Sequence, residues 1–236
     1  MKPKKRQVLI CAALLLACVF LVLPDTGVKG QSETGEEEKA AAITPVASYS
    51  DPYWKEASTD YYSSLTRLKK DLDTAFKPEI FQLLTTEESA AGGIGFWPIP
   101  VRIGEKSRYF CVFAKVYVPP QSPGMPFPDT QTGRILAIMD AYGKKNISFL
   151  ARELKAISDE RLEGAALIFI YARQKPGSAG FEENAEALAL FMKKDDVILF
   201  SELRMTLQTL FSQSEMLPIM QGSQQIENLR LYIIQP

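Results

Sequence analysis

The sequence contains no histidine and only three cysteines among its 236 residues. Without histidine, the usual serine and cysteine nucleophiles lack the base that activates them, and the commonest zinc ligand is missing. Neither a Gly-x-Ser-x-Gly turn nor a Ser-x-x-Lys dyad occurs that could replace these arrangements. We therefore expect no catalytic residues, no metal site and no cofactor.

The chain after the apolar N-terminal stretch contains a single cysteine. Cys11 and Cys18 lie in an apolar N-terminal stretch, so Cys111 is the only cysteine of the remaining chain. A single cysteine cannot form an internal disulfide, and one placed between Tyr109 and Phe113 in an apolar strand behaves as a small apolar residue. We expect Cys111 to pack in the core rather than to react.

The body of the protein also lacks an excess of positive charge. The chain has 27 basic and 28 acidic residues, with a net charge of +4 on residues 1–30 and of −5 on the rest. Proteins that bind nucleic acid present a basic patch or stripe to the phosphate groups. We therefore expect no nucleic-acid partner.

What the sequence does contain is an uncharged apolar segment, Val8 to Leu23, preceded by four basic residues within the first six. As a helix it would span about 24 Å, against about 30 Å for the hydrocarbon core of a bilayer. Positively charged ends stay in the cytoplasm. We expect residues 1–23 to be a signal-anchor or a signal peptide, which holds the chain at a membrane and places the domain on the non-cytoplasmic side, periplasmic or extracellular.

Two other fates of this segment stay open. Cleavage after Gly30, which has Val28 two residues before it, would release a secreted protein. Alternatively, the run Leu15-Leu16-Ala17-Cys18 resembles a bacterial lipobox, in which Cys18 would be acylated to give a lipoprotein. The apolar residues that follow Cys18 argue against lipidation, because the residues directly after the acylated cysteine of a lipoprotein are normally polar.

Residues 24–50 are rich in Gly, Ser, Thr, Glu and Ala and have few large apolar side chains. Ordering such a segment costs more entropy than its burial returns. It is therefore expected to be a flexible polar tether with a reach of about 25–30 Å. The remaining residues, 51–236, are long enough for a single globular domain.

Strand patterns begin with an alternating run around Trp97 that turns at Gly104–Ser107 and returns as Arg108–Val118. The return strand is apolar on both faces, so we expect it to be central, and the two prolines of the first arm favour an edge strand. Further strands are expected at Ile135–Ala141, Ala165–Ala172, Val197–Phe200 and Leu229–Ile234.

Helical spacing of apolar residues predicts helices between and before these strands. The ranges are Tyr61–Phe76, Pro78–Leu84, Asn146–Ile157 (with Asn146 as its cap), Glu182–Lys194 and Leu203–Ser212. Hairpin-linked strands followed by strands that alternate with helices predict an α+β fold, with a mixed, mostly antiparallel sheet and helices packed on it.

Acidic residues cluster at four places, namely Glu87-Glu88, Asp159-Glu160, Glu182-Glu183-Glu186 and Asp195-Asp196. Paired carboxylates can perform acid–base chemistry or hold a divalent cation. Neighbouring residues point apart on a helix or strand, however, and acids near a helix N-terminus are explained by the helix dipole. A carboxylate-dependent or metal-assisted hydrolase of the cell envelope is therefore the alternative function, and it requires two acids that converge in one cleft.

A proline-rich loop is the feature that folding explains least. Five prolines occur between Pro119 and Pro128, and Met125 and Phe127 lie among them without a periodic partner. Such a stiff segment presents side chains at low entropic cost, which suits docking to a partner. We expect a non-catalytic domain that binds a partner protein or peptide in an assembly or sensing role, with Met125, Phe127, Trp97 and Tyr109 as candidate contacts. A small-ligand sensor with an apolar pocket around Trp97 and Tyr109 is a third possibility.

Overall fold

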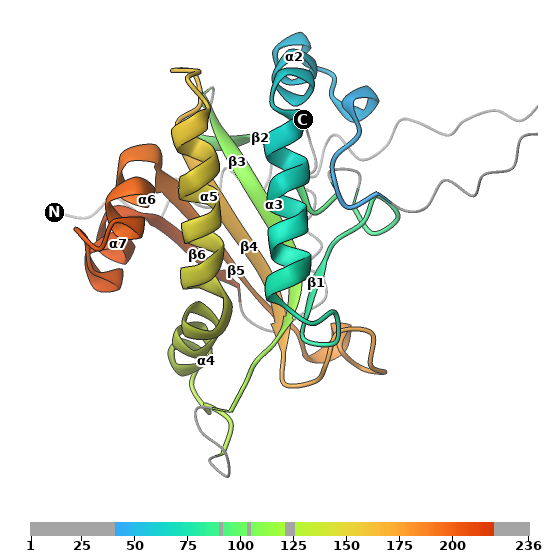
Figure 1. Ribbon diagram of the computed structural model, residues 1–236. Coiled ribbons are helices and arrows are strands. Elements are labelled where there is room, and N and C mark those ends of the chain that lie inside the picture. Colours follow the sequence, from blue (N-terminus) through green and yellow to red (C-terminus); the bar gives the residue numbers. More distant parts are fainter. Residues whose placement is uncertain (1–40, 90–91, 103–104, 121–125, 220–236) are drawn as a thin grey trace, which may run out of the picture. The chain divides into compact units, whose positions relative to one another are not determined.

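Five adjoining strand pairs build one mixed sheet in the computed structural model (Figure 1). The structure describes residues 41–89, 92–102, 105–120 and 126–219, all within one compact unit, Glu38–Pro236. The predicted signal-anchor, Cys18, Met125 and the predicted strand Leu229–Ile234 lie outside these ranges. Among the described residues, no helix has both the length and the apolar character needed to cross a bilayer.

The strands are β1 (Phe81–Leu83), β2 (Ile94–Arg102), β3 (Glu105–Tyr117), β4 (Gly164–Ala172), β5 (Glu186–Lys193) and β6 (Glu215–Ile219). Their order across the sheet is β1-β3-β4-β5-β6, and β2 also pairs with β3. The β3–β4 pair is parallel, whereas the other four described pairs are antiparallel. The predicted α+β class with a mixed sheet is confirmed.

The centre of the sheet is its most deeply buried part. All nine residues of β4 are buried, and strand β5 is buried except at Lys193. Strand β3 pairs with β4 on one side and with β1 and β2 on the other, as its apolar faces predicted. Cys111 is fully buried in β3, where it packs among aromatic and aliphatic side chains. Burial raises the pKa of its thiol well above the ordinary value.

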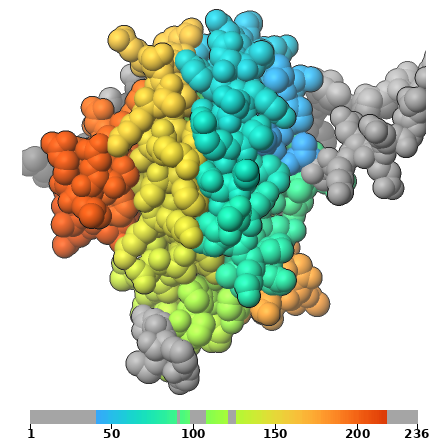
Figure 2. Space-filling view, in the orientation of Figure 1, coloured from blue at the N-terminus to red at the C-terminus, as the bar shows by residue number. Residues whose placement is uncertain are grey.

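The helices pack on this sheet. They are α2 (Pro52–Asp60), α3 (Tyr62–Ala75), α4 (Gln131–Ile138), α5 (Lys144–Ala156), α6 (Lys194–Ser201) and α7 (Leu207–Gln213). Figures 1 and 2 show α3 and α5 side by side across the front of the sheet, with α6 and α7 beside α5. A π-helical turn, Met139–Gly143, joins α4 to α5 at the lower end.

An ion cluster joins α3 to α5. Arg67 Nε donates to both carboxylate oxygens of Glu153 at 3.0 Å, and Arg152 Nε donates to Glu153 Oε1 at 2.8 Å. Burial by itself raises the pKa of Glu153, but the hydrogen bonds from Arg67 and Arg152 together outweigh it, so that the pKa is lowered. This buried carboxylate is therefore a structural group that holds the two helices together.

Two expected elements have the opposite secondary structure before α5. Pro78–Leu84, predicted as a helix, contains strand β1, which pairs with β3 in the register Phe81↔Val116. Ile135–Ala141, predicted as a strand, lies in α4 and the π-turn, because Thr130 caps the helix by accepting from the Gly133 amide at 3.1 Å.

Two further predictions are wrong after β4. Glu182–Lys194, predicted as a helix, forms a short 3₁₀ turn and then β5, because burial between β4 and β6 overrides the helical propensity of its Ala, Leu and Met residues. Val197–Phe200, predicted as a strand, lies in α6, which begins at Lys194 with Asp195 and Asp196 in its first turn.

Asn146 does not cap a helix. It lies inside α5, fully buried, and its Nδ2 donates to the carbonyl of Tyr142 at 2.9 Å. The helix continues directly from the π-turn through Gly143, so no separate cap is needed there. The helix predicted at Tyr61–Phe76 is confirmed as α3, preceded by the unpredicted α2.

Candidate functional site

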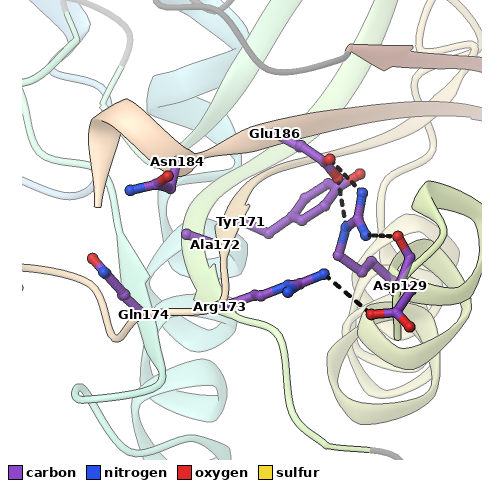
Figure 3. A pocket seen from close by; sticks show the side chains of 8 residues that line it. Asp129, Tyr171, Ala172, Arg173, Gln174, Asn184 and Glu186 are labelled. Atoms are coloured by element: carbon purple, nitrogen blue, oxygen red, sulfur yellow. Dashed lines mark hydrogen bonds and ion pairs between the residues drawn. The ribbon is translucent and has the colours of Figure 1, made fainter. Parts of the chain in front are cut away.

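A cavity of about 490 Å³ lies where β4 ends and β5 begins (Figure 3). One wall comes from the segment that follows the proline-rich loop and from α4, and the other comes from the connection between β4 and β5. The lining residues are Asp129, Arg134, Tyr171, Ala172, Arg173, Gln174, Asn184 and Glu186. Apart from Ala172, every lining side chain carries a charge or a hydrogen-bonding group.

An ion pair between α4 and β5 forms the innermost part of this pocket. Arg134 Nη2 donates to Glu186 Oε1 at 2.5 Å and Arg134 Nε to Glu186 Oε2 at 2.9 Å. The two side chains are only 12% and 10% exposed. The hydrogen bond to Glu186 raises the pKa of Arg134. Such a two-point, largely buried pair fixes the direction of both side chains.

The same guanidinium holds the end of the proline-rich loop. Arg134 Nη1 donates to the carbonyl oxygens of Pro128 at 3.1 Å and of Asp129 at 2.6 Å. Pro128 is buried, and Thr130 begins the cap of α4. Arg134 therefore connects the base of the loop to the central sheet through Glu186. These bonds use four of its five donor N–H groups.

Tyr171 lies beside this pair, near the end of the otherwise apolar strand β4. Its side chain is almost completely buried, and its Oη has no hydrogen-bond partner among the described residues. Glu186 and Gln131 lie near it, and burial, followed by the charge of Glu186, raises the pKa of Tyr171. A buried hydroxyl without a partner costs about 1–3 kcal/mol. The hydroxyl is therefore expected to add little to the stability of the fold.

The outer part of the pocket is more loosely held. Arg173 Nη2 lies 3.7 Å from Asp129 Oδ1, with the side chains 51% and 89% exposed. The same Arg173 nitrogen lies 3.5 Å from the carbonyl oxygen of Pro128, the longest hydrogen-bond contact of this site. On the opposite rim lie Gln174 and Asn184 (Figure 3), both exposed. The pocket thus has a fixed inner arginine and a loosely held outer one.

The predicted contact residue Phe127 lies in the segment that Arg134 holds. Its ring packs edge-on against Tyr117 at the end of β3, with the ring centres 5.9 Å apart. Half-buried in this way, Phe127 has a defined place and still reaches solvent. It lies one residue from the carbonyl that Arg134 binds. The loop prediction and the pocket thus meet at the same end of the sheet.

Trp97 and Tyr109 lie elsewhere, in the core. They face each other across β2 and β3, and their exposed fractions are 1% and 8%. The Trp97 indole donates to Thr44 Oγ1 at 3.4 Å, and the ring of Tyr109 lies 5.7 Å from that of Phe191. From Tyr109 to Tyr117, β3 runs about 26 Å. The structure therefore does not bring these two residues together with Phe127.

Three of the four acidic clusters have a member that pairs with a basic side chain. Lys115 lies 3.1 Å from Glu88 and 2.5 Å from Glu182, so that two of the predicted clusters meet at one lysine. Asp159 accepts from the Tyr53 hydroxyl and from Arg161. Within the described ranges, no group of three or more potential metal ligands is found.

The lining residues of the pocket were not predicted as a site. They come from three separate stretches of the sequence, 129–134, 171–174 and 184–186, which the fold brings together. One signal was present. Tyr171 is the only polar side chain of the run Ala165–Ala172, and Arg173 follows that run directly. A polar group at the end of a buried strand marks a position that opens toward a site.

Comparison with known proteins adds no relative to this description. No model of a known protein family matches the chain, and neither a curated protein nor a solved structure is found that is similar to it.

Proposed function

We propose that this chain is a non-catalytic module, held at a membrane by its N-terminal segment, that binds a partner protein or peptide at the rim of the pocket beside the proline-rich loop. Its role would be one of assembly or sensing on the non-cytoplasmic side of the membrane. The apolar stretch Val8 to Leu23 and the polar composition of the residues that follow it support the location. The loop and the pocket support the binding.

The observation that carries the binding proposal is the double attachment of Arg134. The Nε and Nη2 groups of its guanidinium donate to Glu186 on β5, and its Nη1 group donates to the carbonyls of Pro128 and Asp129. A largely buried ion pair thus fixes the base of a loop whose sequence contains five prolines. A segment whose end is held in this way loses less entropy when it binds, which is the main advantage of preorganisation.

The competing proposal, a carboxylate-dependent hydrolase, has weaker support. Asp129 and Glu186 do line one pocket, as that proposal requires. Both oxygens of Glu186 accept N–H groups of Arg134, however, and Asp129 is 89% exposed. Among the carboxyl groups of the described residues, the pKa departs from its usual value at Glu153, Asp159 and Glu202, and each of these shifts is downward. A general acid needs a raised pKa.

Photo-crosslinking in the full-length chain tests the proposal. A benzoyl-phenylalanine would replace Pro126, which is exposed in the segment that Arg134 holds, and in a control chain it would replace Gln208, which is exposed on α7. Illumination of membranes that contain these chains is expected to give a discrete adduct of higher mass from position 126 only. Absence of an adduct there, or the same adducts from both positions, would reject the proposed binding rim.

A further inference from the structure

The two arginines of the pocket differ in how firmly they are held. Arg134 makes four hydrogen bonds of 2.5–3.1 Å, whereas Arg173 has one contact of 3.5 Å to a carbonyl and one of 3.7 Å to Asp129. Half of the Arg173 side chain is exposed. The fold does not need Arg173 in the way it needs Arg134, so its guanidinium is able to exchange one anionic partner for another.

Two amide side chains line the rim opposite the guanidinium of Arg173. Gln174 follows Arg173 in the chain, and Asn184 lies across the pocket from it (Figure 3). Asn184 Nδ2 donates one N–H to the carbonyl of Gly180 at 3.0 Å and retains a second N–H. In Figure 3 the guanidinium of Arg173 points toward Asp129, and both amides lie on the opposite rim, so a planar oxygen-bearing group that enters from solvent meets the guanidinium first and has the amides across the pocket from it.

The charge of the pocket limits what that group can be. Arg134 and Arg173 balance Asp129 and Glu186, so the lining is formally neutral. Glu186 stays paired with Arg134, and only the charge of Arg173 is available to a newcomer. One guanidinium matches one carboxylate in charge and in its forked geometry. A doubly charged phosphate would leave a negative charge uncompensated beside two carboxylates.

We propose that the pocket binds a single carboxylate group of the partner, with Arg173 as its main donor. The inference rests on the proposed partner-binding function and names the chemistry that the rim recognises. The incoming carboxylate takes the place of Asp129, which returns to water at little cost because it is already 89% exposed and makes only a weak surface pair. The carboxylate comes either from an Asp or Glu side chain of the partner or from the C-terminus of its chain.

The test is a titration of the detergent-solubilised full-length chain, with ¹⁵N-labelled arginine, glutamine and asparagine side chains observed by NMR. Three capped probes are added separately. Acetyl-aspartate amide carries a side-chain carboxylate, acetyl-glycine carries a terminal one, and acetyl-asparagine amide carries none. We expect saturable shifts of the signals of Arg173, Gln174 and Asn184 with at least one of the first two probes, and no such shifts with the third. Which of the two acts identifies the source of the carboxylate.

Matched variants make the result specific. Arg173→Gln is expected to abolish the shifts of Gln174 and Asn184. Arg161→Gln, which removes another half-exposed arginine paired with an aspartate, is expected to leave them unchanged. Asp129→Asn removes the competing carboxylate and is expected to tighten binding of the probe about two- to fivefold, the range of an exposed ion pair.

Equal shifts with acetyl-asparagine amide, or shifts that persist in Arg173→Gln, would overturn the carboxylate proposal. So would the absence of saturable shifts with both acidic probes. None of these results bears on the crosslink from position 126, so the proposed partner-binding function can fail or stand separately. An adduct at position 126 without a carboxylate response would mean that the partner binds the rim and leaves the pocket empty.

Discussion

At the scale of single residues, two buried tyrosines differ in the hydrogen bonding of their hydroxyl groups. Tyr142 donates from its hydroxyl to the carbonyl of Tyr117 at 2.8 Å, while the hydroxyl of Tyr171 has no such partner among the described residues. Both side chains are almost fully buried. The same substitution at the two positions therefore removes one hydroxyl that bonds and one that does not.

We predict that Tyr171→Phe leaves the free energy of unfolding within about 0.5 kcal/mol of the wild type or raises it. Tyr142→Phe removes a bonded hydroxyl and is expected to lower the same quantity by about 1 kcal/mol. Urea denaturation of both variants measures the difference. A larger loss in Tyr171→Phe than in Tyr142→Phe would show that the Tyr171 hydroxyl is bonded in the folded protein.

Asp159 gives a second residue-scale prediction, one that depends on pH. Hydrogen bonds from Arg161, followed by one from Tyr53, lower the pKa of Asp159 from 3.8 to about 2. A carboxyl with a lowered pKa contributes stability above its unfolded-state pKa and loses it as the pH falls through the folded-state value. The shift corresponds to at most about 2 kcal/mol, and to less where water screens the pair.

We therefore predict that the unfolding free energy falls between pH 4 and pH 2, about the window set by the two pKa values, and falls less in Asp159→Asn than in the wild type. The check is a series of urea unfolding curves across that pH range. Identical slopes in the two proteins would contradict the assignment, whatever the absolute stability of the variant.

At the scale of elements, the join between α4, β5 and the proline-rich loop depends on one guanidinium. Replacing Arg134 by Gln leaves Glu186 buried without its partner, and breaking a buried pair in this way costs about 3 kcal/mol. We predict this loss in Arg134→Gln and a smaller one in the double variant Arg134→Gln/Glu186→Gln, which has no unpaired charge. Denaturant unfolding measures both losses, and a double variant that is no more stable than Arg134→Gln would argue against the pair.

The loop should loosen in both variants, because both lose the bonds to the Pro128 and Asp129 carbonyls. Hydrogen exchange is expected to speed up at the amides of residues 133 and 134, which donate to Thr130 just after the loop base, while β4 keeps its protection. Equal exchange in the wild type and the double variant would mean that the prolines alone fix the base of the loop.

Elements with a strong local pattern could be predicted from the sequence. The hairpin of β2 and β3 and the buried run of β4 show their period or their continuous apolar character within about ten residues. Strand β5 could not be predicted, since its Ala, Leu and Met residues favour a helix and only the neighbouring strands decide otherwise. The cap at Thr130, three residues before Gly133, was the signal that would have identified α4 as a helix.

The site was predictable only in part, for the same reason. The loop around Phe127 stands out by composition. The partners that fix it, Arg134 and Glu186, are ordinary helix and strand residues until the fold brings them together. Trp97 and Tyr109 are large aromatic residues whose place in the core follows from the pairing of β2 with β3.

At the scale of the whole molecule, we propose that the first 23 residues set the location of the protein. We predict that the membrane-extracted protein retains residues 1–23, as an uncleaved signal-anchor requires. Intact-mass spectrometry tests this directly. A mass that begins after Gly30 would indicate a secreted protein, and a shortened chain with acyl groups on Cys18 would indicate a lipoprotein.

The central proposal joins the scales: one arginine fixes the base of a loop, and we propose that this loop binds a partner. Its most direct test is the crosslinking yield from position 126 in membranes, compared between the otherwise wild-type chain and the Arg134→Gln/Glu186→Gln variant. The account predicts a discrete adduct that falls about tenfold in the variant, the effect of 1.4 kcal/mol of binding free energy. An adduct of equal yield in both chains would show that the fixed loop base plays no part in binding and would contradict the claim.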